Sequence, residues 1–189
     1  MPINFDHILD SEEIQLRPMR SEDFEDFLQL TMDRELWIYF TSDLSNESEL
    51  RHWINTGVRD MKNKKRLAFS IIDKKTGAVA GSTSIGNISE RDKRVEIGWT
   101  WIGRRYQGKG INDRSKHLLL KYCFEELNCE RVEFKTDILN LPARNALLRI
   151  GATEEGVLRS HTLMTHNRRR DTIYYSILKS EWMQRNYGQ

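Results

Sequence analysis

The first third of the chain carries the patterns of one short strand and two amphipathic helices. Apolar and polar side chains alternate over residues 14–17, which predicts a strand. Ser21 is placed to cap a helix, acidic residues follow in its first turn, and apolar side chains recur at helical spacing over residues 24–31. A second helix is predicted over residues 45–62, where leucine, tryptophan, isoleucine and valine share one face.

The pattern changes to that of β-strands at residue 67. Compact apolar runs over residues 67–72 and 79–85 predict two strands, and the polar segment 73–77 predicts the hairpin turn between them. Residues 87–93 are expected to form a polar loop, and residues 94–102 the next strand. Alternation in that strand assigns its side chains to two faces, with Val95, Ile97, Trp99 and Trp101 on one and Glu96, Gly98 and Thr100 on the other.

The second half of the chain predicts a long helix, a strand, a short helix and two closing strands. The long helix covers residues 111–127, with Lys116 and Lys121 on its outer face. A strand at 132–136 precedes a short helix that Pro142 begins and Gly151 ends, and strands at 153–162 and 171–178 are joined by residues 166–170. This order predicts the α+β class, with a mostly antiparallel mixed sheet of about seven strands and helices on both faces.

Composition limits the classes of protein to which the chain can belong. Its 189 residues contain no linker-like segment, which predicts a single domain over residues 1–189. The 30 basic and 28 acidic residues leave a net charge of +2, which argues against a nucleic-acid-binding protein. The arginines at 168–170 are interpreted either as a solvated turn or as a contact for nucleic acid or an acidic peptide. No apolar run is long enough to span a membrane, and residues 1–13 lack the apolar stretch of a secretion signal.

Cysteines and histidines give no sign of a disulfide framework or a metal site. Cys123 and Cys129 are too few for the former and have no ligand partners nearby, so we expect reduced thiols and a cytoplasmic protein. His52 and His117 lie on predicted helices without a partner at metal-ligand spacing, and we assign no metal. Whether the protein is a monomer or a homodimer is not determined by these patterns.

The strongest chemical feature is a basic, glycine-containing loop between the strand 94–102 and the helix that begins at residue 111. Amide groups at a helix N-terminus point outward and bind anions, and Gly108 and Gly110 allow a phosphate to approach the backbone closely. Arg104, Arg105 and Lys109 add positive charge. The loop therefore predicts a diphosphate-binding site, although a strand-to-helix turn with solvated arginines is the simpler interpretation. Neither the P-loop ending Gly-Lys-Ser/Thr nor the dinucleotide fingerprint G-x-G-x-x-G is present.

The motif Arg105-x-x-Gly108-x-Gly110 after a strand resembles the coenzyme A signature of the GNAT acetyltransferase superfamily. Further matches follow in the same order over residues 14–182: Glu96-Ile97-Gly98-Trp99 before the signature, Asp137-x-x-Asn140 and Gly151-Ala152 after it, and segments 155–159 and 171–176. The last two are similar to the closing hairpin of the Rim-type branch. That branch includes acetyltransferases of ribosomal-protein N-termini and relatives that act on small amines.

The resemblance implies a splayed sheet, in which the strands at 94–102 and 132–136 part at one end. The pantetheine arm of acetyl-CoA would lie between them and pair with the backbone like an added strand. The residues implied to bind the cofactor are Trp101, Ile102, Arg104, Arg105, Gln107, Gly108, Lys109, Gly110, Ile111, Asn112 and Asn140. Two of these have a second interpretation, because Trp101 is also typical of a core residue and Asn140 of a helix cap.

The reaction implied is acetylation of a primary amine, on a protein N-terminus or a small molecule, within a ternary complex. Glu96 is the candidate general base, directly or through water, and its other interpretation is an ordinary salt-bridged strand carboxylate. A backbone N–H of the same strand would hold the oxyanion. Ala143 and Leu147 stand where relatives often have serine and tyrosine, so no acid for the leaving thiolate is identified. A non-catalytic coenzyme A-binding or sensor protein is the alternative hypothesis.

Overall fold

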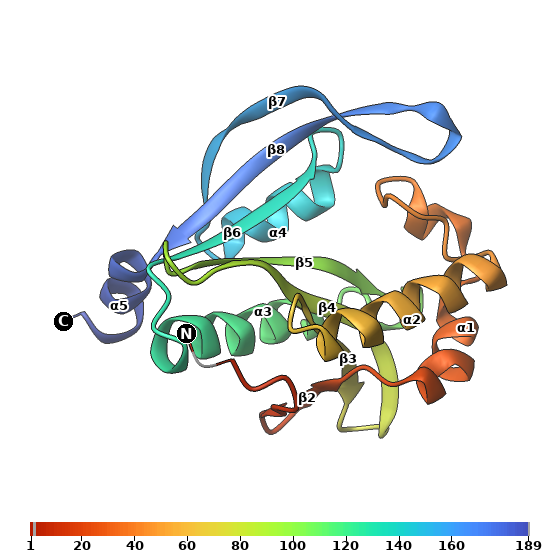
Figure 1. Ribbon diagram of the computed structural model, residues 1–189, viewed down its shortest axis with the longest axis horizontal. Coiled ribbons are helices and arrows are strands. Elements are labelled where there is room, and N and C mark those ends of the chain that lie inside the picture. The colour runs from red at the N-terminus through yellow and green to blue at the C-terminus, as the bar shows by residue number, and fades with distance from the viewer. Residues whose placement is uncertain (2, 189) are drawn as a thin grey trace.

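Eight strands form one mixed sheet in the computed structural model (Figure 1), which describes residues 1 and 3–188. The strands are β1 Leu9–Asp10, β2 Ile14–Pro18, β3 Leu67–Asp73, β4 Ala78–Ser89, β5 Arg94–Ile102, β6 Arg131–Asp137, β7 Thr153–Leu163 and β8 Arg169–Leu178. Their order is β1-β2-β3-β4-β5-β6-β8-β7, and only the pair β5 and β6 is parallel. The predicted α+β class and mixed, mostly antiparallel sheet are confirmed.

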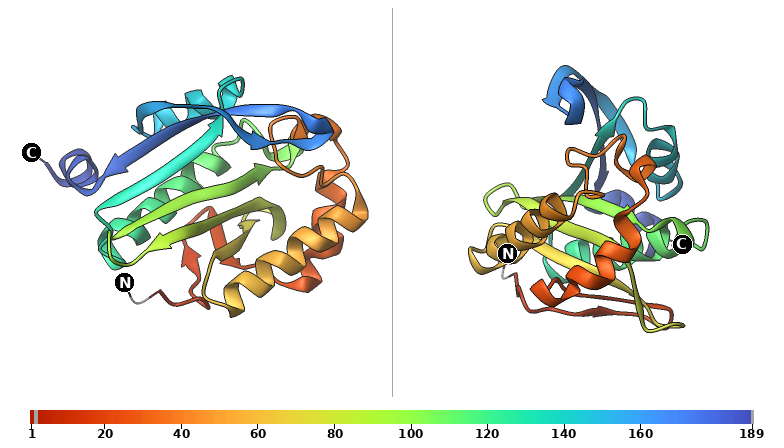
Figure 2. Two further views of the ribbon diagram at one scale, coloured as in Figure 1. Left: turned by 45° about the horizontal axis from the view of Figure 1, so that its top comes forward. Right: turned by 90° about the vertical axis from the view of Figure 1, so that its right-hand side faces the viewer.

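Helices cover both faces of this sheet (Figure 2). α1 Phe24–Thr31 and α2 Glu47–Lys62 lie on one face, and α3 Ile111–Lys121 lies on the other. α4 Leu141–Arg149 follows β6, and α5 Lys179–Tyr187, which was not predicted, follows β8. Shorter helical turns span Ser21–Asp23, Arg34–Trp37, Arg104–Tyr106, Tyr122–Glu126 and Thr165–Asn167. Within the described residues, no helix combines the length and the apolar composition needed to cross a membrane.

The parallel strands β5 and β6 run side by side only at their starts. Their pairing joins residues 94–96 to residues 131–133 and ends there, while β5 continues to Ile102 and β6 to Asp137. Each strand keeps its other neighbour, β4 or β8, along its length. The two strands therefore separate, as predicted, and we call the space between residues 97–102 and 134–137 the wedge. Its two edges present peptide groups that have no strand partner on that side.

A bulge at Trp99 reverses the faces of β5. Trp99 has a φ of 52°, which is rare for a bulky residue, and the pairing with β4 shifts at this point. Beyond the bulge, Trp101 packs against Phe27 of α1 with ring centroids 5.1 Å apart, whereas Thr100 faces α3. The predicted alternation is therefore wrong beyond Gly98, because one extra residue in a strand moves every following side chain to the opposite face.

The surroundings of the Trp99 ring hold it in this conformation. A Cβ atom on Gly86 would lie 2.7 Å from the ring, so only glycine leaves room for it. The Arg66 guanidinium lies over the face of the ring, 5.0 Å from its centroid, in a cation–π contact. Neighbouring side chains thus support a strained backbone conformation, of the kind that is usually retained beside functional sites.

Three local predictions are corrected by the structure. Ser21 does not cap α1, because it opens the turn Ser21–Asp23, and the Asp23 carboxylate accepts the Arg20 N–H instead. The polar loop at 87–93 is shorter than predicted, since β4 runs to Ser89. Lys116 is not on an outer face: it is 6% exposed and points from α3 toward the sheet.

A buried ion pair joins β2 to β3 next to the start of α1. Asp23 is 3% exposed and accepts hydrogen bonds from Arg17 Nη2 and from Ser70 Oγ, each at 2.5 Å. Burial alone would raise the pKa of Asp23, but these hydrogen bonds outweigh it and hold the pKa below its usual value. The ionised pair therefore stabilises the fold above the usual pKa of aspartate, and this contribution is lost in acid.

Candidate functional site

The loop from β5 to α3 forms a concave row of backbone donors. Gly108 and Gly110 adopt φ values of 71° and 75°, a region that glycine enters without strain. Within the described part of the chain, the backbone N–H groups of residues 108–113 have no hydrogen-bond acceptor. A Cβ built on Gly108 would meet no atom within 4 Å, so the row is open there, whereas one built on Gly110 would lie 2.7 Å from the Arg114 guanidinium. Such a row at the start of α3 fits a diphosphate group.

Arg104, which was predicted to bind the diphosphate, forms ion pairs with two carboxylates. Its Nε donates to Asp33 at 2.8 Å, and its Nη2 contacts Glu35. The hydrogen bond from Arg104 lowers the pKa of Asp33. Both acids lie beside the turn Arg34–Trp37, so Arg104 fastens this segment to the loop, and a phosphate would have to compete for it.

Two further cations of the loop, Arg105 and Lys109, lie at the ring of Tyr106. The Arg105 guanidinium lies 5.0 Å and the Lys109 ammonium 5.6 Å from the centroid of its buried ring. Neither cation has an acidic partner among the described residues. Gln107 instead closes the turn, because its Nε2 donates to the Ile102 carbonyl at 3.0 Å. Arg105 and Lys109 are thus the cations of this loop best placed for an anion.

The remaining predicted cofactor residues have mainly structural contacts. Ile111 is 5% exposed and anchors the start of α3 in the core, with Asn112 half-buried beside it. Asn140 Oδ1 accepts the Ala143 N–H at 3.2 Å, so the interpretation of Asn140 as the cap of α4 is confirmed. Leu147 is 7% exposed on the same helix.

Trp101 borders the wedge through its backbone only. Its indole packs among the rings of Phe27, Trp37 and Trp53, so the core interpretation of this side chain is confirmed. The indole Nε1 is buried and has no acceptor within the described residues. The peptide groups of Trp101 and Ile102 belong to the part of β5 that lacks a β6 partner, where an extended arm could pair with them.

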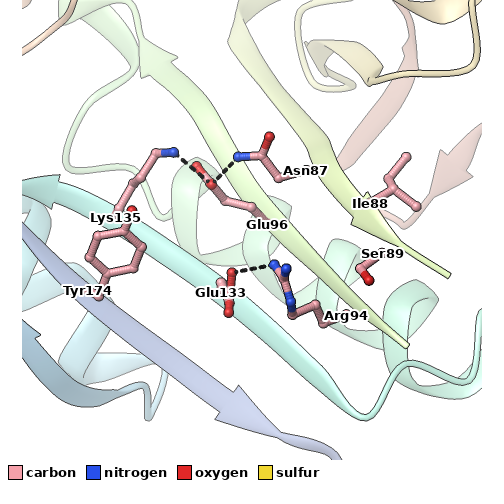
Figure 3. Close-up of a pocket in the computed structure, with 8 residues that line it drawn as sticks. All are labelled: Asn87, Ile88, Ser89, Arg94, Glu96, Glu133, Lys135 and Tyr174. Carbon is pink, nitrogen blue, oxygen red and sulfur yellow. Dashed lines mark hydrogen bonds and ion pairs between the residues drawn. The ribbon is translucent and has the colours of Figure 1, made fainter. Parts of the chain in front are cut away.

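A cavity of about 650 Å³ opens beside the paired starts of β5 and β6 (Figure 3). Its lining consists of Asn87, Ile88, Ser89, Arg94, Glu96, Glu133, Lys135 and Tyr174. Glu96 is 4% exposed, and its Oε2 accepts a hydrogen bond from Asn87 Nδ2 at 2.7 Å and pairs with Lys135 Nζ at 3.0 Å. The salt-bridged interpretation of Glu96 is confirmed, and the same carboxylate faces a cavity large enough for a substrate group.

Charges of both signs alternate around this cavity. Besides the pair of Glu96 and Lys135, Glu133 accepts from Arg94 at 3.1 Å and from Arg131 at 2.9 Å. Sequence reasoning missed these partners, although polar residues 133 and 135 alternate with apolar ones in a predicted strand. The pattern shows that these side chains share a face, but not that β6 lies next to β5.

The arginines at 168–170 do not form the solvated turn that was one of their two interpretations. Arg168 donates to the buried carboxylate of Asp137 at 2.5 Å. Arg170 is 7% exposed on β8, where its Nε donates to Thr172 Oγ1 at 3.0 Å, and burial lowers its pKa. The Arg168 contact ties the closing hairpin to β6, and Arg169 is the exposed member of this run.

Comparisons with known proteins agree with this geometry. The family model for the acetyltransferase (GNAT) domain matches residues 13–153. The protein named "Putative ribosomal N-acetyltransferase YdaF" of Bacillus subtilis is 30% identical over 180 residues, which cover 91% of this chain and 94% of that protein. The "Uncharacterized N-acetyltransferase p20" of Bacillus licheniformis is 31% identical over 177 residues, with 91% of this chain and 96% of that protein covered.

A solved structure shares the fold over nearly the whole chain. The crystal structure of a GCN5-related N-acetyltransferase from Brucella melitensis superimposes with a TM-score of 0.84 at 26% identity. The match covers 94% of this chain and 80% of the other. The fold is therefore shared with an N-acetyltransferase over nearly the whole chain.

Proposed function

The chain belongs to the GNAT acetyltransferase family, and from that premise we propose that it transfers the acetyl group of acetyl-CoA to a primary amine in a ternary complex. The observation that carries this proposal is the row of N–H groups over residues 108–113, which have no acceptor in the described part of the chain and lie at the end of β5 beside the wedge. A diphosphate at the row and an extended arm in the wedge are the two requirements of a coenzyme A thioester.

Each part of the site has a defined task in this proposal. The backbone donors of residues 108–113 hold the diphosphate, helped by Arg105 and Lys109. The edge of β5 around Trp101 and Ile102 pairs with the pantetheine arm, and a backbone N–H near the bulge faces the thioester oxygen. Acetyl-CoA supplies the activated acetyl group, while these residues orient it toward the cavity that contains Glu96.

Glu96 acts as the general base on the incoming amine. An alkylammonium must lose a proton before it can attack a carbonyl carbon, and Glu96 is a buried carboxylate within that cavity. Its hydrogen bond from Asn87 and its pair with Lys135 keep it oriented. An ammonium entering the cavity would share or replace the Lys135 contact, and Glu96 would then receive the proton directly or through water.

We take the acceptor to be a protein N-terminus or a small primary amine, and the protein to act in the cytoplasm. The name of the Bacillus subtilis relative favours an N-terminus of a ribosomal protein. The cavity of about 650 Å³ admits a terminal residue rather than a folded surface. Cys123 and Cys129 are buried free thiols, in keeping with a reducing compartment.

A thiol-release assay with acetyl-CoA tests the proposal on peptides with different N-terminal residues and on a panel of amines. The wild-type protein is expected to release coenzyme A only when an acceptor is present. Glu96→Gln should lower kcat about 100-fold or more at neutral pH, because it removes the base while keeping the shape of the side chain. Glu12→Gln, at an exposed turn, controls for the loss of one negative charge and should leave kcat unchanged.

Calorimetry with coenzyme A separates this function from the alternative of a coenzyme sensor. Glu96→Gln should bind coenzyme A as tightly as the wild-type protein. If the wild-type protein binds coenzyme A tightly but acetylates no acceptor, the sensor hypothesis is favoured. Ala143 and Leu147, which cannot act as acids, are compatible with that hypothesis. Equal turnover by Glu96→Gln and wild type would remove Glu96 from the mechanism.

A further inference from the structure

Lys116 is a buried lysine that, among the described residues, has no acidic partner. It is 6% exposed, and its Nζ donates to Thr100 Oγ1 at 2.6 Å. No carboxylate among the described residues lies within ion-pair distance of it, and burial lowers its pKa to about 7. Buried lysines of this kind cost stability and are retained mainly where a protein uses them.

The ammonium lies at the wedge, between the two strands that separate. Thr100 belongs to the part of β5 beyond residue 96, where pairing with β6 ends. On the β6 side, the ring centroid of Phe134 is 6.0 Å from Lys116 Nζ, and Phe134 directly follows the last paired residue of that strand. One residue from each separated strand therefore flanks the Nζ atom, which reaches the wedge from the face that α3 covers.

Other charged groups near this position are engaged elsewhere. On the same helix, Asp113 is paired with Arg149 at 3.5 Å, and Arg114 donates to Glu13 at 2.8 Å. From β5 the group that faces Lys116 is the hydroxyl of Thr100, which lies 2.8 Å from that of Thr83, and from β6 it is an aromatic ring. Nothing in this environment neutralises the lysine, so an anion formed in the wedge would be its natural partner.

The proposed acetyl transfer forms such an anion. We propose that Lys116 is the catalytic acid of this protein, and that its ammonium stabilises and protonates the coenzyme A thiolate as it leaves. The inference rests on the proposed function, which requires a proton donor that Ala143 and Leu147 do not supply. The proposal also explains why this lysine is buried, although the sequence periodicity places it on the outer face of its helix.

The proton balance of this step closes. The carbon–sulfur bond breaks with its electron pair going to sulfur, and one proton moves from Lys116 Nζ to that sulfur, which leaves a thiol and a neutral lysine. The ammonium of the acceptor loses one proton to Glu96 before it attacks, and Glu96 passes this proton to water. The nitrogen of the adduct loses a second proton by the same route. Lys116 then regains a proton from water, so each acetyl transfer returns both residues to their starting state and releases one proton to the solvent. A donor with a pKa of about 7 is acidic enough to protonate an alkyl thiolate, whose thiol has a pKa near 8.5.

The test measures the ionisation of coenzyme A bound to the protein, and it needs no acceptor. Thiolate absorbs ultraviolet light that thiol does not, so a pH titration of the complex gives the pKa of the bound thiol. In the wild-type complex this pKa is expected to lie at least about one unit below its value in Lys116→Met, because an ammonium beside sulfur favours the thiolate. Lys121→Met, which removes an exposed lysine from the end of the same helix, should match wild type.

Two results would overturn the inference in distinguishable ways. If wild type and Lys116→Met both bind coenzyme A and give the same thiol pKa, Lys116 does not meet the sulfur, while the proposed function stands. If wild type does not bind coenzyme A at all, the proposed function and the inference fail together. In the thiol-release assay, Lys116→Met should lose about 10- to 100-fold in kcat, and Lys116→Arg should lower the thiol pKa without restoring kcat, because arginine keeps the charge but not the proton transfer.

Discussion

Gly108→Asp is the change that most directly tests the diphosphate-binding loop. Gly108 has a φ of 71°, and a Cβ at this position would meet nothing within 4 Å, so the new side chain finds room in the free protein. The cost to folding is then about 1 kcal/mol from the left-handed backbone conformation. The cost to coenzyme binding is larger: a carboxylate about 5 Å from a phosphate, at an effective dielectric constant of about 20–40, contributes about 2–3 kcal/mol of repulsion. Affinity is expected to fall about 30- to 150-fold.

Calorimetry with coenzyme A, together with urea unfolding, separates these two costs. Gly77→Asp is a matched control, because Gly77 has a φ of 69° with nothing within 4 Å but lies in the turn between β3 and β4. It should lose the same stability as Gly108→Asp and bind coenzyme A normally. Gly108→Asn, which has nearly the same shape without the charge, should lose much less affinity than Gly108→Asp. Unchanged affinity in Gly108→Asp would refute the assignment of this loop.

Three further predictions concern charges at other positions. Lys116→Met should raise the free energy of unfolding by about 3–5 kcal/mol below pH 7, because burial lowers the pKa of the lysine from 10.5 to about 7. The difference between the two proteins should shrink as the pH approaches 10.5, where the lysine of the unfolded chain also loses its proton. A pH-independent difference in urea unfolding would contradict this prediction. Asp33→Asn should tighten coenzyme binding about two- to fivefold at low salt, because it removes one of the two carboxylates that pair with Arg104 and leaves only Glu35. Calorimetry should find no such gain when Arg104→Gln is also present. Asp23→Asn should cost about 3 kcal/mol at neutral pH, because it leaves the half-buried Arg17 without its charged partner. The cost should be smaller in acid, where wild type loses the ionised pair as well, and equal stabilities at pH 7 would show that the pair contributes nothing.

Local patterns were sufficient for most of the fold. Strand β5 and the hairpin of β3 and β4 lie where apolar alternation and turn residues put them, and α2 begins within two residues of its predicted start, at Glu47 rather than residue 45. The loop before α3 also lies where the sequence put it, and its two glycines adopt positive φ. These features depend on residues close together in the chain, whose preferences are expressed before any distant contact forms.

The chemistry of the site was decided by tertiary structure. The carboxylate of Glu96 could be singled out in the sequence, but its partners Asn87 and Lys135 come from strands on either side of β5. Lys116 lies outside the apolar stripe of its helix and was therefore assigned to solvent, yet the packing of α3 on the sheet buries it. The bulge at Trp99 then turned Thr100 toward that lysine.

By itself, then, the sequence determined which segments become strands and helices and where an anion-binding turn lies. Which strands are neighbours, where two of them part, and which polar side chains meet in the resulting space were decided only by the folded chain. The physical reason is that periodicity reports a residue's orientation relative to its own element, whereas a cavity, an ion pair or a buried amine depends on the element packed opposite, and that element is distant in the sequence.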